Sequence, residues 1–345
     1  MKGSKVNLLV NSTLALGVTL LCLLLVEFTI LPVWATGGLH RDLALLGFYA
    51  TPNSTVGDTP INADGFTGTE LSALEASTEE INVLTLGGST LFNRRMTERM
   101  LSNWQQMHGA NWTVTGGALR THTTRASLIK YQEIFSHYDF DYVVIYHGVN
   151  DLWTNNVPAA DFRTDYSHMQ PWYKRNILLE NSLVARYLYN GYYRGTGVFP
   201  RDNINAADFA SNATFESNLQ ELIAAIRANG ATPILMSFAW HIPENYSLDG
   251  FKAYEVGYNN PTHYDECPVE LWGTTSYVRA GLNLHNQTLR KLARNTQTHL
   301  IDLDSYLSGN IENFGDVVHL SDIGTDRLVE RVGRELGVLA ADALD

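Results

Sequence analysis

Cysteine is scarce in this sequence. The 345 residues contain two, Cys22 within an apolar N-terminal run and Cys267 far downstream. Given this separation we expect no disulfide to hold the folded part together, so a buried core must stabilise it. The apolar content of 45% and the aromatic content of 11% are ample for such a core.

Basic residues are also few, and they form no cluster. Lys and Arg total 24 against 36 Asp and Glu, which gives a formal net charge of −12. Without a basic patch the chain lacks the cluster of positive charge that binds nucleic-acid phosphates. We therefore do not expect nucleic acid as a partner. His147, His241 and His263 are scattered without the spacing of a ligand set, and we expect no metal and no other cofactor.

One long apolar run lies near the N-terminus. Residues 14–34 are almost wholly apolar and follow Lys2 and Lys5. The run is long enough to cross a bilayer, and its positive flank predicts a periplasmic or extracellular location for the rest of the chain. Residues 1–35 are then a retained signal anchor, which the length of the run favours, or a signal peptide cleaved near Ala35. Glu27 opposes the anchor, because a carboxylate in lipid is costly.

Beyond this run, short apolar strands alternate with amphipathic helices. Residues 36–80 have no sustained period and are interpreted as a stalk and lead-in segment. Strands are expected at 83–86, 112–115, 142–146, 233–238 and 299–302. Their alternation with helices predicts an α/β domain over 81–345, a three-layer α/β/α sandwich around a five-stranded parallel sheet. Irregular insertions are expected at about 152–212 and 239–275.

The strand at 83–86 ends in two glycines and a serine. Gly87 and Gly88 lack a Cβ, so the chain can turn sharply and another molecule can approach the backbone. Ser89 then stands at the carboxyl end of a strand, where sites in parallel sheets lie, and at a helix N-terminus, which favours negative charge. Ser89 is therefore a candidate nucleophile.

Four polar blocks follow one another in order along the chain: Gly87-Gly88-Ser89, Gly117, Gly148-Val149-Asn150-Asp151 and Asp316-Val317-Val318-His319. In these blocks the chain resembles the SGNH, or GDSL-type, hydrolase superfamily, from about residue 81 to the last helix. The resemblance implies the SGNH hydrolase fold with a flavodoxin-like sheet. Two positions depart from the pattern. Gly88 replaces the usual Asp of Gly-Asp-Ser, and Gly116 is an alternative to Gly117.

The resemblance also implies a role for each block. Ser89 matches the nucleophile, His319 the base and Asp316 the acid behind it. The Ser89 and Gly117 N–H groups and the Asn150 side chain match the oxyanion donors.

Ester hydrolysis by a serine requires these residue types, independently of the resemblance. A serine hydroxyl needs a base, imidazole titrates near neutrality, and a carboxylate fixes the ring and stabilises its cation.

The sequence therefore predicts an exported serine hydrolase that cleaves esters through an acyl-serine intermediate. O-acetyl esters of carbohydrate are the first substrate class to expect, because the insertions are rich in aromatic residues. Gly88, Asp151 and Trp240 are candidate substrate contacts, since each lies just after a predicted strand. Two alternatives stay open: a saccharide O-acetyltransferase with the same triad, and a non-catalytic cell-envelope binding module. The sequence does not indicate an oligomeric state.

Overall fold

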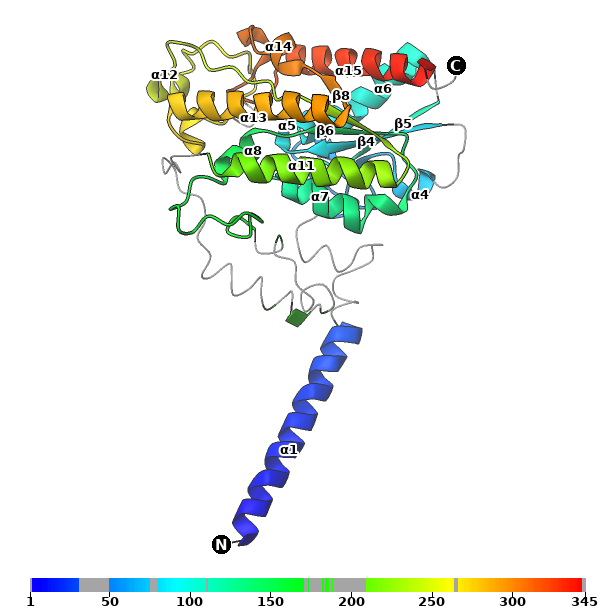
Figure 1. The fold of residues 1–345 in the computed structure, drawn as a ribbon, viewed down its shortest axis with the longest axis vertical. Helices are drawn as coiled ribbons and strands as arrows, with labels where there is room; N and C mark the ends of the chain where they lie inside the picture. Colours follow the sequence, from blue (N-terminus) through cyan, green and yellow to red (C-terminus); the bar gives the residue numbers. More distant parts are fainter. Residues whose placement is uncertain are drawn as a thin grey trace.

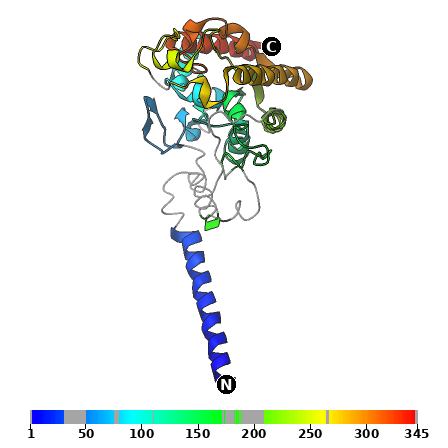
Figure 2. The ribbon, with the colours of Figure 1, turned by 90° about the vertical axis from the view of Figure 1, so that its left-hand side faces the viewer.

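The structure is a computed structural model that describes residues 2–30, 50–74, 80–109, 111–170, 173, 182, 184–185, 188, 209–263 and 266–342. It contains a domain in which helices cover both faces of one sheet (Figure 1). The N-terminal helix α1 (Lys2–Leu25) extends away from this domain in both views (Figures 1 and 2).

The central sheet confirms the predicted parallel strands and adds one. Its parallel strands are β4 (Ile81–Gly87), β5 (Trp112–Gly116), β6 (Tyr142–Tyr146), β7 (Thr232–Met236) and β8 (His299–Ile301). They lie in the order β5-β4-β6-β7-β8, which is the flavodoxin-like order. A two-residue strand, β3 (Thr67–Gly68), pairs antiparallel with β5 and makes the sheet six-stranded, so the predicted total of five is too low.

The long helices alternate with the parallel strands along the chain, as the sequence pattern predicts. Helices α6 (Met96–His108) and α15 (Asp322–Asp342) pack on one face of the sheet, and α7 (Thr124–Glu133) and α11 (Ser211–Ala228) on the other. Helix α13 (Thr275–Thr296) contributes to both apolar clusters. Short helices complete the domain: α5 (Ser89–Phe92), α8 (Val149–Trp153), α12 (Leu248–Lys252), α14 (Leu303–Leu307), η2 (Phe135–His137), η4 (Val269–Leu271) and η5 (Ile311–Asn313).

Strand β4 shows why its sequence is an unbroken apolar run. Val83 belongs to the cluster beneath α6 and α15, whereas Leu84 and Leu86 belong to the cluster beneath α7 and α11. All three side chains are fully buried. A parallel strand that is covered on both faces has apolar residues on both, so a continuous apolar run is the sequence pattern that indicates it.

The segment before residue 81 is more structured than a stalk. It holds the hairpin of β1 (Thr55–Val56) and β2 (Thr59–Pro60), then β3 and α4 (Leu71–Leu74). Phe66 is 1% exposed, and its ring lies 4.9 Å from that of Phe135. The predicted domain start at 81 is therefore too late, because single apolar residues between turns give no period for a sequence pattern to detect.

The two predicted insertions differ in what the structure describes. Residues 239–275 contain α12 and η4, and Ile242, Val269 and Trp272 are buried in the core. The other insertion, 152–212, lies largely outside the described residues. Its described part includes the buried Tyr166.

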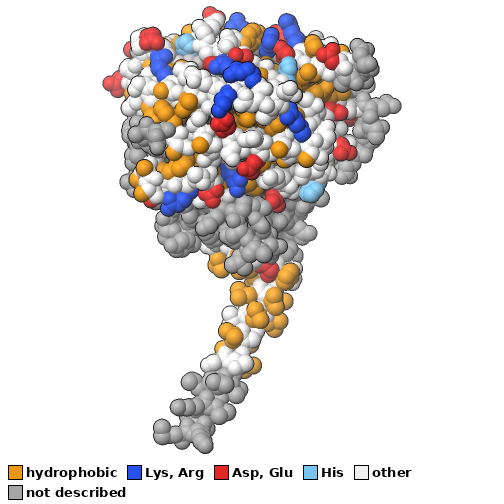
Figure 3. Space-filling view, in the orientation of Figure 1, with side chains coloured by type: hydrophobic (Ala, Val, Ile, Leu, Met, Phe, Trp, Pro, Cys, Tyr) orange, Lys and Arg blue, Asp and Glu red, His pale blue; other side chains and the backbone are white. Residues whose placement is uncertain are grey.

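Near the N-terminus the structure has a helix long and apolar enough to span a membrane, with its most apolar window at Ser12–Thr29. Its exposed side chains are largely hydrophobic (Figure 3). A π-helical turn, η1 (Val26–Ile30), follows α1, and the Glu27 carboxylate there accepts hydrogen bonds from Ser182 Oγ at 2.9 Å and the Val184 N–H at 2.8 Å. Residues 31–35, including the proposed cleavage site, lie outside the described residues.

Candidate active site

The turn between β4 and α5 leaves little room for a side chain at either position before Ser89. A Cβ on Gly87 would lie 2.8 Å from the carbonyl oxygen of Tyr146, and a Cβ on Gly88 would lie 2.5 Å from Asn150 Nδ2. Neither distance is sterically possible without movement. The two glycines thus allow β6 and its following helix to approach Ser89, which begins α5 and is half-buried.

Three predicted residues form a chain of hydrogen bonds at this turn. Ser89 Oγ lies 2.8 Å from His319 Nε2, and His319 Nδ1 lies 2.7 Å from Asp316 Oδ2. With the Nδ1 proton donated to the carboxylate, Nε2 is the acceptor for the serine hydroxyl. These are the distances that a nucleophile, a base and an orienting acid require. Ser89 and His319 are 230 residues apart in the sequence, and the fold brings their side chains together.

The Asp316 carboxylate is held by several donors. It is fully buried, and its Oδ1 accepts the N–H groups of Val318 at 2.8 Å and His319 at 2.7 Å. Its Oδ2 accepts the Cys267 N–H at 2.9 Å as well as the His319 ring. The carboxylate is therefore fixed in one orientation, which in turn fixes the imidazole. The sequence could not have predicted the contribution of Cys267, because a backbone N–H donates whatever the side chain.

The charge of Asp316 determines the titration of His319. Burial alone would lower the pKa of the imidazole, since it disfavours the charged form. The adjacent carboxylate, through its charge and its hydrogen bond, outweighs burial and raises the pKa of His319 well above its ordinary value. The protonated form of the His319 ring is thereby stabilised.

Asn150 lies beside the turn that carries Ser89, whereas the Gly117 N–H is already hydrogen-bonded within the sheet. The Asn150 Nδ2 group donates one proton to the His122 carbonyl at 2.9 Å and faces Gly88. The Gly117 N–H donates to the Thr85 carbonyl at 2.8 Å, as an extension of the sheet. The predicted oxyanion role of Gly117 is thus wrong in this structure, because its N–H is already used.

Gly116 is not a replacement donor, since it is the last residue of β5 and pairs with Thr85 and Thr67. The loop that reaches the turn before Ser89 lies further along the chain. In it the Leu119 N–H donates to the Gly87 carbonyl at 3.2 Å.

Two of the candidate substrate contacts lie elsewhere. Asp151 is fully buried and accepts the Thr124 N–H at 3.1 Å and its hydroxyl at 2.5 Å, so it caps α7. Burial raises the pKa of Asp151 to about 7, although the Thr124 hydrogen bonds oppose this. Trp240 packs partly against the core, and its backbone N–H donates to Ser308 Oγ. The prediction for Asp151 is wrong, and Trp240 is not part of the pocket beside His319.

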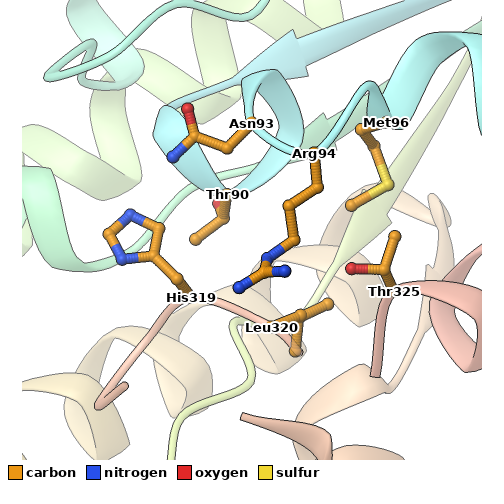
Figure 4. Close-up of a pocket in the computed structure, with 7 residues that line it drawn as sticks. All are labelled: Thr90, Asn93, Arg94, Met96, His319, Leu320 and Thr325. Carbon is orange, nitrogen blue, oxygen red and sulfur yellow. The ribbon is translucent and has the colours of Figure 1, made fainter. Parts of the chain in front are cut away.

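A pocket adjoins His319 on the α5 side, and we call it the histidine pocket (Figure 4). It is lined by Thr90, Asn93, Arg94, Met96, His319, Leu320 and Thr325. In Figure 4 the Arg94 side chain reaches down between His319 and Thr325. Sequence reasoning missed Asn93, Arg94 and Thr325, because no motif spans α5 and α15.

The histidines without a role in the triad do not converge. His147 contacts Ser127, His241 contacts the Ser308 carbonyl, and His263 pairs with Glu266 at 2.7 Å. In the described part of the chain, the group of potential metal ligands found close together is Cys267, Asp316 and His319. There His319 Nδ1 and the Asp316 carboxylate are already hydrogen-bonded to each other.

Several solved structures are similar in fold. A lipase/acylhydrolase from Enterococcus faecalis has 14% identity and a TM-score of 0.42, covering 74% of this chain and 95% of its own. A GDSL-like lipase from Bacteroides thetaiotaomicron has 12% identity and a TM-score of 0.43, covering 78% and 95%. An acetylxylan esterase from Geobacillus stearothermophilus has 12% identity and a TM-score of 0.42, covering 76% and 97%. A comparison with curated proteins finds no match.

The family of the chain follows from the sequence. Residues 64–327 match the GDSL-like lipase/acylhydrolase family, and this range begins within the structured segment before β4 and ends within α15. Because the match covers most of the chain, including Ser89, Asp316 and His319, the chain belongs to the GDSL-like lipase/acylhydrolase family and is an SGNH-type esterase.

Proposed function

We propose that the protein cleaves carboxylic esters with Ser89 as nucleophile, His319 as base and Asp316 as the acid that orients the base. The observation that carries this proposal is the hydrogen-bond chain of 2.8 Å and 2.7 Å through the imidazole. Its position at the carboxyl end of β4, directly after Gly87 and Gly88, favours access for a substrate.

In the first step His319 Nε2 takes the hydroxyl proton while Ser89 Oγ bonds to the ester carbon. The tetrahedral intermediate places negative charge on the former carbonyl oxygen. When it collapses, the bond to the alcohol oxygen breaks and His319 returns the proton to that oxygen, leaving an acyl-serine. Water then attacks the acyl-serine with the same proton transfers and releases the acid.

Two donors are proposed to stabilise the oxyanion. Ser89 is the first residue of α5, so its N–H has no acceptor within the helix. The Asn150 amide lies against Gly88 and has a second N–H besides the one donated to His122. Each such donor contributes about 3–4 kcal/mol to transition-state stabilisation.

We infer that the domain works outside the cytoplasm on O-acetyl esters of carbohydrate, held to a membrane by its N-terminal helix. The apolar window at Ser12–Thr29 supports the anchor. The Glu27 carboxylate, which opposed it, is hydrogen-bonded to Ser182 and Val184, and this reduces its cost in or near lipid. The same triad would serve an acetyltransferase, which differs by delivering the acyl group to a sugar hydroxyl.

The test uses the full chain in a mild detergent, assayed with p-nitrophenyl esters of increasing chain length and with a fluorophosphonate probe. We expect hydrolysis and labelling in the wild type and neither in Ser89→Ala. Labelling with acetyl turnover only in the presence of a sugar acceptor would indicate the transferase. A folded protein that is neither labelled nor active would support a binding module.

A further inference from the structure

The amine of Lys130 is buried inside the domain. Lys130 lies on α7 and is 0% exposed, and the apolar cluster beneath this helix includes its neighbours Leu128, Ile129 and Tyr131. Burial disfavours a charged amine and lowers the pKa of Lys130 to about 7. An apolar side chain would pack in this place at a lower cost, so what the amine contacts must explain why a lysine is there.

The Lys130 amine donates a hydrogen bond to the carbonyl oxygen of Gly117. Gly117 begins the segment 117–122, which joins β5 to α7. Two further hydrogen bonds fix the first half of this segment. The Gly117 N–H donates to the Thr85 carbonyl at 2.8 Å, and the Leu119 N–H donates to the Gly87 carbonyl at 3.2 Å. Lys130 therefore binds the segment from the side of α7, while β4 binds it from the other side.

The last residue of the segment carries the acceptor for the proposed oxyanion donor. The His122 carbonyl accepts a hydrogen bond from Asn150 Nδ2 at 2.9 Å. The two N–H groups of an amide lie in one plane, so the direction of the first N–H fixes the direction of the second. A shift of the His122 carbonyl would therefore turn the N–H of Asn150 that is proposed to face the oxyanion.

The backbone of the segment is strained just before His122. Thr121 has a φ of 64°, in the left-handed region that a β-branched residue rarely adopts. The Thr121 side chain is exposed, so its burial does not compensate for the strain. Such a conformation persists where the surrounding contacts impose it. The hydrogen bonds made by Gly117, Leu119 and His122 are contacts of this kind.

Lys130 is one of three polar residues that follow each other at intervals of three on α7. The other two, Thr124 and Ser127, make hydrogen bonds to the segment 147–151, which contains Asn150. Residues three apart lie on one face of a helix. One face of α7 thus contacts both segments that meet at the proposed oxyanion donor, and Lys130 is the residue that binds the earlier one.

We propose that Lys130 is a positioning residue for ester hydrolysis. By holding the Gly117 carbonyl it keeps the segment 117–122 in its strained conformation. The His122 carbonyl at the end of that segment then directs the second N–H of Asn150 toward the oxyanion. The inference rests on the proposed function, because it requires Asn150 to be an oxyanion donor. Lys130 acts through the backbone and not on the substrate itself.

The test is a double-mutant cycle in the full chain in a mild detergent, with p-nitrophenyl acetate as the substrate. Lys130→Met removes the donor and keeps an unbranched side chain of similar size. It is expected to lower kcat about tenfold and to leave KM within twofold. In an Asn150→Ala background the same change should lower kcat less than twofold, because the group that Lys130 positions is absent. The melting temperature should be unchanged or higher, since an apolar side chain replaces a buried amine.

Tyr131→Phe is the matched control. Tyr131 is the next residue on α7 and is equally buried, and among the described residues its hydroxyl has no partner in the segment 117–122. This variant should leave kcat within twofold in both backgrounds. Lys130→Gln is the second variant, since it is shorter but keeps an N–H donor. Its kcat should lie between those of the wild type and Lys130→Met, and it carries the cycle if Lys130→Met does not fold.

An unchanged kcat in Lys130→Met would overturn the inference. An equal fall in kcat with and without the Asn150 amide would overturn it too, because Lys130 would then act elsewhere. Ester hydrolysis is kept in both cases, provided that Ser89→Ala abolishes turnover and labelling. A wild type that resists the fluorophosphonate and cleaves nothing would refute the proposed hydrolysis, and this inference with it.

Discussion

Two Ser–His pairs in this domain have the same hydrogen-bond length and opposite surroundings. Ser89 Oγ lies 2.8 Å from His319 Nε2, and Ser127 Oγ lies 2.8 Å from His147 Nε2. Ser89 is half-buried on a turn, whereas Ser127 is fully buried within α7.

The charged groups near the two imidazole rings differ as well. His319 has the Asp316 carboxylate at 2.7 Å, which raises the pKa of the imidazole. His147 has the buried Lys130 nearby. Burial first, and the Lys130 charge second, lower the pKa of His147 to about 3. A ring that cannot accept a proton cannot activate a hydroxyl, so the distance between serine and histidine does not by itself identify a nucleophile.

The largest effect should come from deleting each serine in turn. Ser89→Ala is expected to lower kcat for ester hydrolysis by about 10⁴-fold or more, because the covalent step is lost. Ser127→Ala should leave kcat within a few-fold and instead cost about 1–3 kcal/mol of stability, since His147 Nε2 loses its partner. Initial rates and thermal melts of both variants measure this. Equal losses of activity in the two variants would show that the pairs are not functionally different.

Removing the acid should reduce activity next most strongly. Asp316→Asn is expected to lower kcat by about 10³–10⁴-fold, because the imidazole loses the acceptor that fixes its tautomer. His319 must be neutral to act as a base, so activity should rise with pH through its pKa. The acid limb of the profile should lie above pH 6.5 in the wild type and shift lower in the variant.

Asp302→Asn is the control for this change. Asp302 accepts from Arg290 at 2.7 Å, and that pair lies between α13 and the segment after β8. Its loss should affect thermal stability and leave the pH profile of kcat unchanged. If the acid limb does not shift in Asp316→Asn, the Asp316 carboxylate does not set the pKa of His319.

The proposed oxyanion donor should have a smaller effect. Asn150→Ala is expected to lower kcat about 10²–10³-fold with little change in KM, since the amide acts when charge develops. Asn155→Ala is its matched control. The Asn155 amide is fully buried and donates to the Leu152 carbonyl and to Ser211 Oγ, so its loss should reduce stability instead of kcat. Steady-state kinetics distinguish the two, and an equal fall in kcat would contradict the role of Asn150.

The sequence predicted those parts of the fold and site that short-range patterns carry. Strand β6 has the predicted bounds, and Ser89 is positioned by the two glycines beside it. Asp316 and His319 are only three residues apart, so a loop brings them together without help from the fold.

What depends on contacts between distant segments was not predictable. Phe66 is buried in an apolar cluster that includes Phe135, and the Gly117 N–H donates to the carbonyl of Thr85 on a neighbouring strand. Asp151 resembles a site residue in sequence, yet a helix N-terminus at Thr124 takes both of its oxygens. Contacts made by backbone groups or by buried apolar surfaces do not require particular residue types. A sequence motif therefore cannot reveal them.

The smallest effect concerns stability, where the two histidines should respond to pH with opposite sign. The pKa of His147 is lowered to about 3, so between pH 6.5 and 3 the unfolded chain binds a proton that the folded chain does not. Its contribution is present above pH 6.5 and is lost as the pH falls. The pKa of His319 is raised, so its contribution is present below pH 6.5 and is lost as the pH rises through the raised value.

Urea unfolding of the full chain at several pH values, followed by tryptophan fluorescence, measures both slopes. His147→Gln should flatten the loss of stability below pH 6.5, by at most about 1.4 kcal/mol per pH unit for one proton. His319→Gln should leave that acid slope in place and flatten the fall above pH 6.5. Identical pH profiles for the two variants would mean that burial and Lys130 do not set the charge of His147 and that Asp316 does not set the charge of His319. The comparison between the two Ser–His pairs would then rest on exposure alone.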